Sequence, residues 1–343
     1  MKTSELSQKL LSWYDVAGRN LPWRHKGGAH PDPYVVLVSE IMLQQTTVKT
    51  VIPFFARFMQ RFPTVGDLAA APVEEVYQYW QGLGYYSRAR SLHTAAQTIA
   101  DEYGGRFPDT KEEVLKLKGI GPYTAASFLA LAFNRPETVV DGNVMRIICR
   151  MFHYTEPLPD IMNKIREKAA MLTSVERPAD YASAIMDLGA EVCTPRRPRC
   201  DVCPWRQACL SAGKDDVADI PHRVKTTKKE ISGNVYVITD SRGYVFIRRR
   251  TEKGLLSGLY EFPWSEKPVF PSAQDTGVSV THIFTHIRLT LRIYRLQSDN
   301  LSATGCFVPP QKLKDYPSST LMKKVYAAVR PLEILSDFPQ NTQ

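Results

Sequence analysis

The stretch Cys193-Thr-Pro-Arg-Arg-Pro-Arg-Cys200-Asp-Val-Cys203-Pro-Trp-Arg-Gln-Ala-Cys209 places four cysteines at the spacing C-x6-C-x2-C-x5-C. Four thiols within one short loop are typical of metal and iron–sulfur sites in compartments that keep thiols reduced. Four-cysteine zinc sites also use a C-x2-C pair. The spacing therefore predicts a metal or cluster site at residues 193–209. Zinc and an iron–sulfur cluster remain alternatives, and two disulfides are less favoured.

The composition indicates a globular protein with a polyanionic partner. The chain has 343 residues, enough for two or three domains, and its 44 Lys and Arg exceed its 35 Asp and Glu to give a net charge of +9. An excess of this sign favours nucleic acid before membrane. The N-terminal residues lack the apolar core of a signal peptide, and no apolar run reaches membrane-spanning length. We expect a cytoplasmic protein with no membrane partner.

Residues 4–192 carry an almost continuous helical pattern. Asp32-Pro33 reads as a helix start, and the helix expected over residues 34–59 should break or kink near Pro53. Thr110-Lys-Glu-Glu113 has the pattern of a capping box and predicts another start. Further helices are expected at residues 85–103, 123–133, 143–152 and 179–192. This part of the chain is predicted to be all-α.

The pattern changes after Cys209. Residues 211–230 are polar and charged and read as a linker. Residues 235–238 and 244–247 flank Asp240-Ser-Arg-Gly243, which predicts a hairpin, and residues 287–293 alternate as a half-buried strand does. Residues 319–335 are predicted to form a closing helix. The second domain is therefore expected to be α+β.

Lys116-Leu-Lys-Gly119-Ile120-Gly121-Pro122-Tyr123 contains a G-x-G turn between two expected helices. Backbone N–H groups at such a helix N-terminus can bind a DNA phosphate without reading a base. An ordinary connection between two helices is the alternative for this turn taken alone.

Two carboxyls are candidates for chemistry. Asp141 stands just before the helix expected at residues 143–152, where a carboxylate commonly caps. Glu40 lies within an apolar helical stretch, where burial would raise its pKa and suit it to act as a general acid. The alternative for Glu40 is a side chain that faces solvent between two buried positions.

Taken together and in this order, the hairpin turn, the aspartate and the cysteine loop resemble the helix-hairpin-helix DNA glycosylases of the endonuclease III superfamily. Within that superfamily they resemble the A/G-specific adenine glycosylases (the MutY family). The matching stretches are Leu21-Pro-Trp-Arg24, Ser39-Glu-Ile-Met-Leu-Gln-Gln-Thr46, Gly82-Leu-Gly-Tyr-Tyr-Ser-Arg-Ala-Arg90, Gly119-Ile-Gly121, Val140-Asp-Gly-Asn-Val144 and the four cysteines. The likeness is dense over residues 1–210 and weaker beyond them.

The resemblance implies a multidomain architecture. It implies an all-α catalytic domain at residues 1–210, with the helix-hairpin-helix at about 110–133 and a [4Fe-4S] cluster on the loop at 193–209. The cluster ligands would be Cys193, Cys200, Cys203 and Cys209. A linker at 211–230 and an α+β Nudix-like recognition domain at 231–343 would follow. The implied partner is double-stranded DNA with A:8-oxoguanine or A:G mispairs, bound by a monomer.

The resemblance also implies roles for single residues. Glu40 would protonate adenine at N7, and Asp141 would stabilise the positive sugar or bond to it before water attacks, while Tyr123 and Asn143 position these groups. Relatives that also cleave the strand have a lysine where this chain has Tyr123, so base excision without efficient strand cleavage is expected. The residues implied to contact DNA or the substrate are Arg24, Leu43, Gln45, Thr46, Leu83, Tyr85, Gly119, Gly121, Phe284, Thr285 and His286.

Three features depart from the family pattern. Ser183 stands where the adenine pocket often has Glu or Gln, and Thr285 stands where the Phe-Ser-His loop has serine. Gly258-Leu-Tyr-Glu-Phe-Pro263 fits the Nudix pattern, but the acidic run that binds magnesium in Nudix hydrolases is missing, so no nucleotide hydrolysis is expected. The alternative functions are an endonuclease III-type glycosylase–lyase for oxidised pyrimidines and a non-catalytic iron–sulfur DNA-binding protein.

Overall fold

The computed structural model describes residues 2–25, 31–158, 160–222, 227–252, 254–301 and 304–336. The chain divides into two compact units. The first comprises Met1–Ala71 with Arg88–Lys225, and the second comprises Pro72–Ser87 with Thr226–Gln343. None of the helices within these described ranges is long and apolar enough to cross a membrane.

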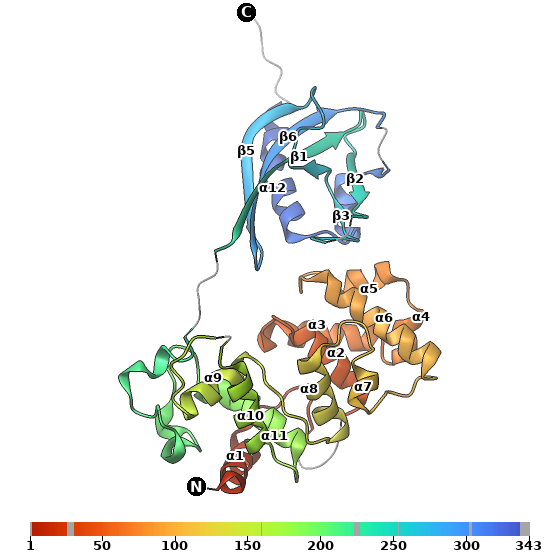
Figure 1. Cartoon of the computed structure of the whole chain (residues 1–343). Coiled ribbons are helices and arrows are strands. Elements are labelled where there is room, and N and C mark those ends of the chain that lie inside the picture. Colours follow the sequence, from red (N-terminus) through yellow and green to blue (C-terminus); the bar gives the residue numbers. More distant parts are fainter. Residues whose placement is uncertain are drawn as a thin grey trace, which may run out of the picture. The chain divides into compact units, whose positions relative to one another are not determined.

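The first unit is helical (Figure 1). Its α-helices are α1 (Thr3–Ala17), α2 (Pro33–Leu43), α3 (Val48–Arg61), α4 (Val65–Ala70), α6 (Tyr86–Glu102), α7 (Lys111–Val114), α8 (Pro122–Phe133), α9 (Gly142–Met151), α10 (Met162–Leu172) and α11 (Pro178–Asp187). A π-helical turn, Leu188–Val192, continues α11, and short 3-10 turns follow at Cys200–Val202, Arg206–Ala208 and Asp215–Ala218. The all-α prediction for this part of the chain is confirmed.

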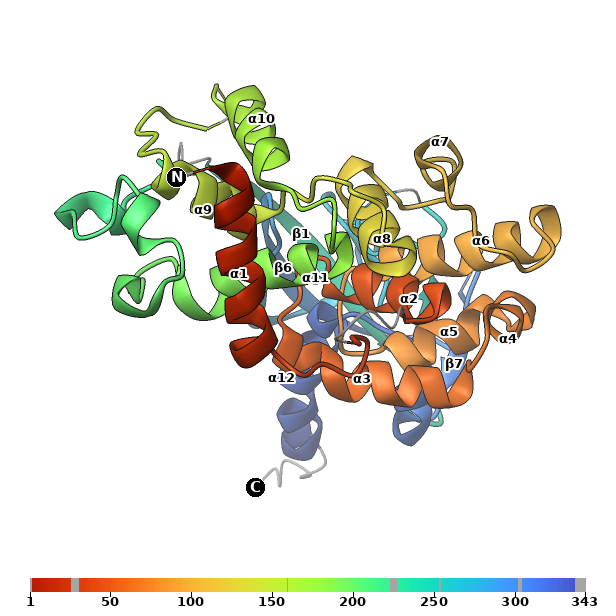
Figure 2. The same cartoon turned by 90° about the horizontal axis from the view of Figure 1, so that it is seen from below.

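Helix α8 forms the centre of this unit. All its residues from Thr124 to Ala132 are buried, and it packs against α2 and α11, while α1 packs against α11 (Figure 2). Because α8 is enclosed on several sides, its sequence is apolar all round rather than amphipathic. The side chains that α2 and α11 turn toward α8 are therefore drawn into one interior.

The single helix expected over residues 34–59 is two helices, and the break lies at residues 44–47 rather than at Pro53. The Asp32 carboxylate caps α2 by accepting from the Tyr34 N–H at 2.8 Å, and Gln45 has a left-handed backbone with φ of 57°. Thr47 caps α3, accepting from the Thr50 N–H through its side chain. Pro53 lies inside α3 without ending it. A strong cap and a left-handed residue outweighed the proline signal.

Much of the segment expected to be a linker is folded onto the first unit. Ser211 is buried, and Ile220 lies in the same apolar core as residues of α1, α9 and α11. The backbone carbonyl of Ile220 accepts a hydrogen bond from Nε of Arg150 at 3.0 Å. Residues 223–226 of the expected linker lie outside the described residues, and residues 229–230 already belong to the first strand.

The second unit contains α5 (Val73–Trp80) and a mixed sheet covered on one face by α12 (Thr320–Ser336) (Figure 1). The strands are β1 (Lys229–Thr239), β2 (Val245–Arg249), β3 (Tyr260–Glu261), β4 (Trp264–Ser265), β5 (Gln274–Ile283), β6 (Ile287–Gln297) and β7 (Cys306–Val308). The main order is β3-β2-β1-β6-β5, with β1 and β6 parallel and the other pairs antiparallel. The expected hairpin, the alternating strand and the closing helix are all present.

Candidate active site and cysteine loop

Glu40 lies in the last turn of α2 and is buried, with 7% of its surface exposed. Burial raises the pKa of its carboxyl, the Ser127 hydroxyl and the Arg24 guanidinium hold the pKa down in part, and Asp141 raises it further. The solvent-facing alternative for Glu40 is therefore wrong. A carboxyl in these surroundings keeps its proton to a higher pH than an exposed glutamic acid does.

Asp141 is held differently, as the N-cap of α9. Its carboxylate accepts hydrogen bonds from the Val144 N–H at 2.7 Å and from Nδ2 of Asn143 at 2.9 Å. Two donors therefore point at the oxygens of Asp141, and the carboxyl lies at the positive end of the α9 dipole. The structure thus brings Asn143 into contact with Asp141, and Asp141 close enough to Glu40 to affect its pKa.

Tyr123 lies in the first turn of α8 and belongs to the same group of side chains. Burial raises the pKa of its phenol, and the nearby charges of Glu40 and Asp141 raise it further. The hydroxyl lies 3.8 Å from the sulfur of Met186 in α11. The phenol is therefore a neutral group beside the two carboxyls.

Arg24 lies at the edge of this group. Its Nη1 is 2.7 Å from Oδ1 of Asp187, a carboxylate with no exposed surface that also accepts three hydrogen bonds from Arg19. The two arginines hold the pKa of Asp187 below its ordinary value, although burial alone would raise it. Arg24 is thus fixed by an ion pair that motif reading did not identify, and it acts on the pKa of Glu40.

The hairpin turn leads from α7 into α8. Gly119 has a φ of 82°, and a Cβ at this position would lie 2.4 Å from Cβ of Ser91, so any larger residue would meet both strain and a clash. Gly121 is the exposed N-cap residue of α8, and Pro122 is the first residue of that helix. The turn therefore presents an open helix N-terminus, as the sequence predicted.

The residues between α2 and α3 are held by Arg88, which sequence reasoning missed. Its buried guanidinium donates to the carbonyls of Ile41 and Met42 at 3.1 and 2.9 Å and to the carbonyl of Gln44. Its Nη2 also donates to the Thr46 hydroxyl at 3.1 Å. Leu43 and Thr46 are half-buried here, and the side chain of Gln45 is exposed. Arg88, from another helix, thus binds the free carbonyls at the C-terminal end of α2 and fixes the loop that contains Gln45 and Thr46.

Within the second unit, Tyr85 and Thr285 meet. The Tyr85 hydroxyl and the Thr285 hydroxyl lie 2.8 Å apart, and Tyr85 has a left-handed backbone with φ of 48° and is half-exposed. Leu83, by contrast, is buried. Phe284 precedes Thr285, its ring packs edge-on against His282, and its N–H donates to the Ile287 carbonyl at 2.7 Å. His286 closes the turn by accepting from the Lys229 N–H through its carbonyl at 2.9 Å.

The four cysteines of the loop line one small cavity together with Arg150, Arg199 and Arg206. All are free thiols, and burial raises the pKa of Cys203 to about 12, with the other three thiols adding to the rise. Burial also raises the pKa of Cys209. A bound cation would favour the thiolate form of these thiols. Among the residues that the structure describes, no three His, Cys, Asp or Glu side chains are placed to hold a single metal ion.

Two buried arginines of α9 tie the cysteine loop to the rest of the unit. Arg146 donates to the Cys193 carbonyl at 2.8 Å and, through Nη2, to Oδ1 of Asn143 at 2.8 Å and to the Gly189 carbonyl at 2.7 Å. Arg150 donates to the carbonyls of Thr194 and Pro195 at 2.6 and 2.7 Å, and its Nη1 lies 3.5 Å from Sγ of Cys193.

Arg146 thus connects Asn143, which contacts Asp141, with the first cysteine of the loop. Sequence reasoning missed both arginines. Their spacing of four residues in an otherwise apolar helix was the available signal, because it places two charges on one buried face.

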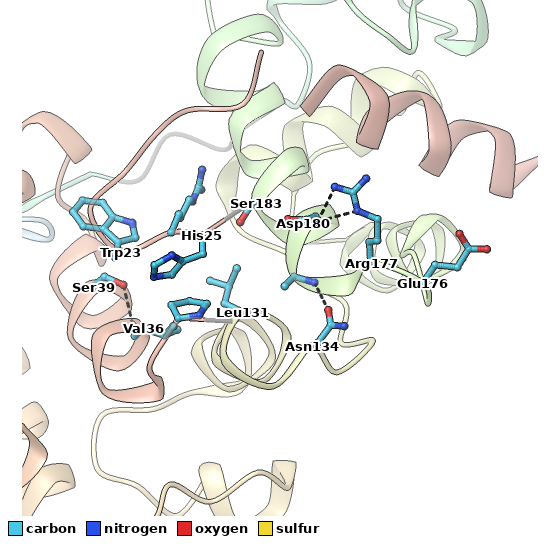
Figure 3. Close-up of a pocket in the computed structure, with 13 residues that line it drawn as sticks. Trp23, His25, Val36, Ser39, Leu131, Asn134, Glu176, Arg177, Asp180 and Ser183 are labelled. Atoms are coloured by element: carbon cyan, nitrogen blue, oxygen red, sulfur yellow. Dashed lines mark hydrogen bonds and ion pairs between the residues drawn. The ribbon is translucent and has the colours of Figure 1, made fainter. Parts of the chain in front are cut away.

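Beside these groups lies a cavity of about 380 Å³ between α2, α8, α11 and the segment that follows α1 (Figure 3). Its walls include Trp23, Arg24, Ser39, Leu131 and Ser183. It therefore brings Arg24 and Ser183, two residues that the sequence singled out for the substrate pocket, to one space.

Two stretches of the chain match known families. Residues 38–171 match the family described as "HhH-GPD superfamily base excision DNA repair protein", and residues 234–328 match the family described as "NUDIX domain". The first match spans α2 to α10 and includes Glu40, Tyr123 and Asp141. The second spans the mixed sheet and most of the closing helix.

Similar proteins include the adenine DNA glycosylase of Rattus norvegicus, 33% identical over 93% of this chain and 77% of that protein. The adenine DNA glycosylase of Mus musculus is 35% identical over 92% of this chain and 76% of that protein. Among solved structures, a thermostable thymine-DNA glycosylase is 29% identical with a TM-score of 0.55, and the match covers 61% of this chain and 96% of that one.

Proposed function

The chain belongs to the adenine DNA glycosylase family, whose members act in base excision repair, and on that premise we propose its substrate and mechanism. It hydrolyses the N-glycosidic bond of adenine mispaired with 8-oxoguanine or guanine in double-stranded DNA. The pairing of Glu40, buried with a raised pKa, and Asp141, a hydrogen-bonded carboxylate at a helix N-terminus, carries this proposal.

The two carboxyls supply the two charges that the reaction needs. Adenine is a poor leaving group until its ring is protonated, and the sugar becomes positive as the bond breaks. Glu40 gives its proton to N7, and the electrons of the C1′–N9 bond leave with adenine. The Asp141 carboxylate faces the cation at C1′. Water then adds to C1′ and loses a proton, which leaves an abasic site and free adenine.

Tyr123 makes strand cleavage inefficient. A glycosylase that also cleaves the strand forms a Schiff base through an amine, and a phenol cannot do this. The raised pKa of Tyr123 keeps the phenol neutral, so it positions Glu40 and Asp141 rather than attacking the sugar. Asn143 supports Asp141 through the 2.9 Å hydrogen bond and so fixes the direction of the carboxylate.

Adenine must leave the duplex before it can reach Glu40, which costs unstacking energy. We assign Gln45 and Tyr85, both in left-handed backbone conformations, to insert into the stack of bases. Thr46, Leu83 and the Phe284–His286 loop would contact the base opposite the adenine. The N–H groups at the start of α8, beside Gly119 and Gly121, would bind backbone phosphate. Arg24 and Leu43 would line the base pocket. The enzyme acts as a monomer on its DNA.

The cysteine loop, in this proposal, carries a [4Fe-4S] cluster held by Cys193, Cys200, Cys203 and Cys209. The donor set fits, because four thiols line one cavity and thiolates are the usual ligands of iron–sulfur clusters. When bound, the cluster would cross-link four positions of the loop and make the thiols thiolates. Arg150, at 3.5 Å from Sγ of Cys193, would stabilise that charge. A brown protein with iron supports this assignment, and a colourless one with zinc contradicts it.

Single-turnover excision on four duplexes tests the proposed function. The duplexes carry A opposite 8-oxoguanine, A opposite G, A opposite T, and thymine glycol opposite A. We expect rapid adenine release from the first, slower release from the second and none from the third, with strand breaks only after alkali. Cleavage at thymine glycol without adenine release would place the protein with the oxidised-pyrimidine glycosylase–lyases. Binding without any release would make it a DNA-binding protein.

A further inference from the structure

The cavity beside the catalytic group is large enough for a small molecule. Its volume of about 380 Å³ falls in the range of small-molecule pockets, roughly 300–1,000 Å³. Figure 3 shows Trp23 and His25 on one side and Leu131 and Ser183 on the other. All of its lining residues belong to the first unit.

The cavity begins where the catalytic group ends. Ser39, which lines the cavity, is the residue next to Glu40 in α2. Arg24, which also lines it, lowers the pKa of Glu40. Val36 lies four residues before Glu40 in α2 and also lines the cavity. Four residues of α-helix rise about 6 Å. The cavity therefore extends along α2, one helical turn beyond the proton donor.

Helix α8 repeats this arrangement on the facing wall. The Ser127 hydroxyl acts on the Glu40 carboxyl, and Leu131, one turn further along α8, lines the cavity. Between the two walls lies Ser183 of α11, whose short side chain is 5% exposed. Because Ser183 is short, it takes up little of the cavity that it lines, and a longer side chain at this position would occupy part of that space.

The chemistry of adenine says which group would enter this space. N7 and the exocyclic N6 lie on the same edge of the purine. When Glu40 faces N7, a substituent on N6 extends along that edge, away from the sugar. The walls of the cavity include apolar carbons of Val36, Leu131 and Trp23, while the charged Arg177 and Asp180 pair with each other at 2.7 Å. An apolar substituent matches these apolar parts of the walls.

We propose that this cavity is a subsite for apolar substituents on N6 of the flipped base, so that the enzyme excises N6-alkyl- and N6-benzyladenine as well as adenine. The inference rests on the proposed adenine excision, because it places N7 at Glu40. The reaction is the same hydrolysis: the C1′–N9 bond breaks, water supplies the oxygen at C1′, and the products are an abasic site and the free N6-substituted adenine.

The test compares two bases in the same duplex. Single-turnover rates are measured for adenine and for N6-benzyladenine, each opposite 8-oxoguanine, with the full-length protein. The unaltered enzyme should excise N6-benzyladenine within about tenfold of adenine, the loss that one imperfectly packed group causes. Adenine release without release of N6-benzyladenine overturns the subsite alone, whereas no release of either base overturns the proposed function.

A filled cavity shows where the substituent binds. Leu131→Phe adds a ring to the far wall without touching Glu40 or Asp141 and should slow N6-benzyladenine at least about tenfold, by overpacking, relative to adenine. Leu131→Met, of nearly the same volume, is the matched control and should keep the ratio of the two rates. Thermal unfolding of both variants checks folding. An unchanged ratio in folded Leu131→Phe overturns the proposal.

Discussion

The region around Glu40 and the region around Asp141 hold the same functional group in opposite surroundings. Glu40 lies in the last turn of α2, where the backbone N–H groups are used by the helix itself, and burial is the largest influence on its pKa. Asp141 lies at a helix start, where the Val144 N–H and the Asn143 amide point at its oxygens. One carboxyl is buried and has a raised pKa, and the other accepts two hydrogen bonds at a helix N-terminus.

The difference teaches how one domain supplies a proton and a negative charge at the same pH. Desolvation disfavours the charged carboxylate, whereas hydrogen bonds and a helix N-terminus favour it. The two effects are set by position in a helix rather than by residue type. Such separation of two carboxyls is the arrangement that glycoside hydrolysis requires.

Replacing either carboxyl, Glu40 or Asp141, should cause the largest loss of excision rate. Glu40→Gln cannot donate a proton and should lose about 10²–10⁴-fold in single-turnover adenine excision, the range of general acid catalysis. Asp141→Asn is the matched control at the other region: asparagine is as good an N-cap as aspartate, so the fold stays while excision falls about 10²–10³-fold through the lost charge. Thermal unfolding and DNA binding are measured beside the rates. Retained excision in Glu40→Gln would remove it as the acid.

A smaller loss of excision rate should follow when Arg146, which holds Asn143 beside Asp141, is replaced. Arg146→Lys keeps the charge but loses the fork that joins Asn143 to the Cys193 carbonyl, so excision should fall about tenfold through the lost hydrogen bonds. Arg150→Lys is the comparison, because the contacts described for Arg150 join the cysteine loop but not Asn143.

Rates in both arginine variants are compared at equal iron content. Arg150→Lys should then excise adenine nearly as the unaltered enzyme does. Equal rates for the two variants would contradict a role for Arg146 in holding the Asp141 region.

The smallest expected effect lies in the second unit, away from both carboxyls. Thr285→Val removes one hydroxyl of the Tyr85–Thr285 pair at nearly constant shape, and Tyr85→Phe removes the other. Each variant should lose the net free energy of one hydrogen bond, about 0.5–1.5 kcal/mol. The preference for 8-oxoguanine over guanine opposite adenine should fall by several-fold in each. The double variant should lose no more than either single one. Additive losses would show that the hydroxyls act separately.

The parts of the site that the sequence predicted are those with a local signal. Asp141 precedes a helix start, Gly119 and Gly121 form a turn, and Glu40 sits in an apolar helical stretch, so each could be interpreted from its neighbours. The cysteine spacing is local in the same way.

What the sequence did not reveal depends on tertiary contacts. Arg88 supports the end of α2 from another helix, and Arg146 and Arg150 reach carbonyls more than forty residues away. The break before α3 was assigned to Pro53, because the proline signal is stronger in isolation than the Thr47 cap and the left-handed Gln45. Ile220 was placed in a linker, because its polar neighbours concealed one buried anchor.

The pH dependence of single-turnover adenine excision, with saturating enzyme on A opposite 8-oxoguanine, tests the opposition of the two carboxyls most directly. Burial raises the Glu40 pKa, so the acid form persists above the ordinary range of a glutamic acid, and the rate should fall as the pH rises through that raised pKa. The residual rate of Glu40→Gln should lack this fall. A rate that climbs with pH in the unaltered enzyme, or the same fall in Glu40→Gln, would contradict Glu40 as the proton donor.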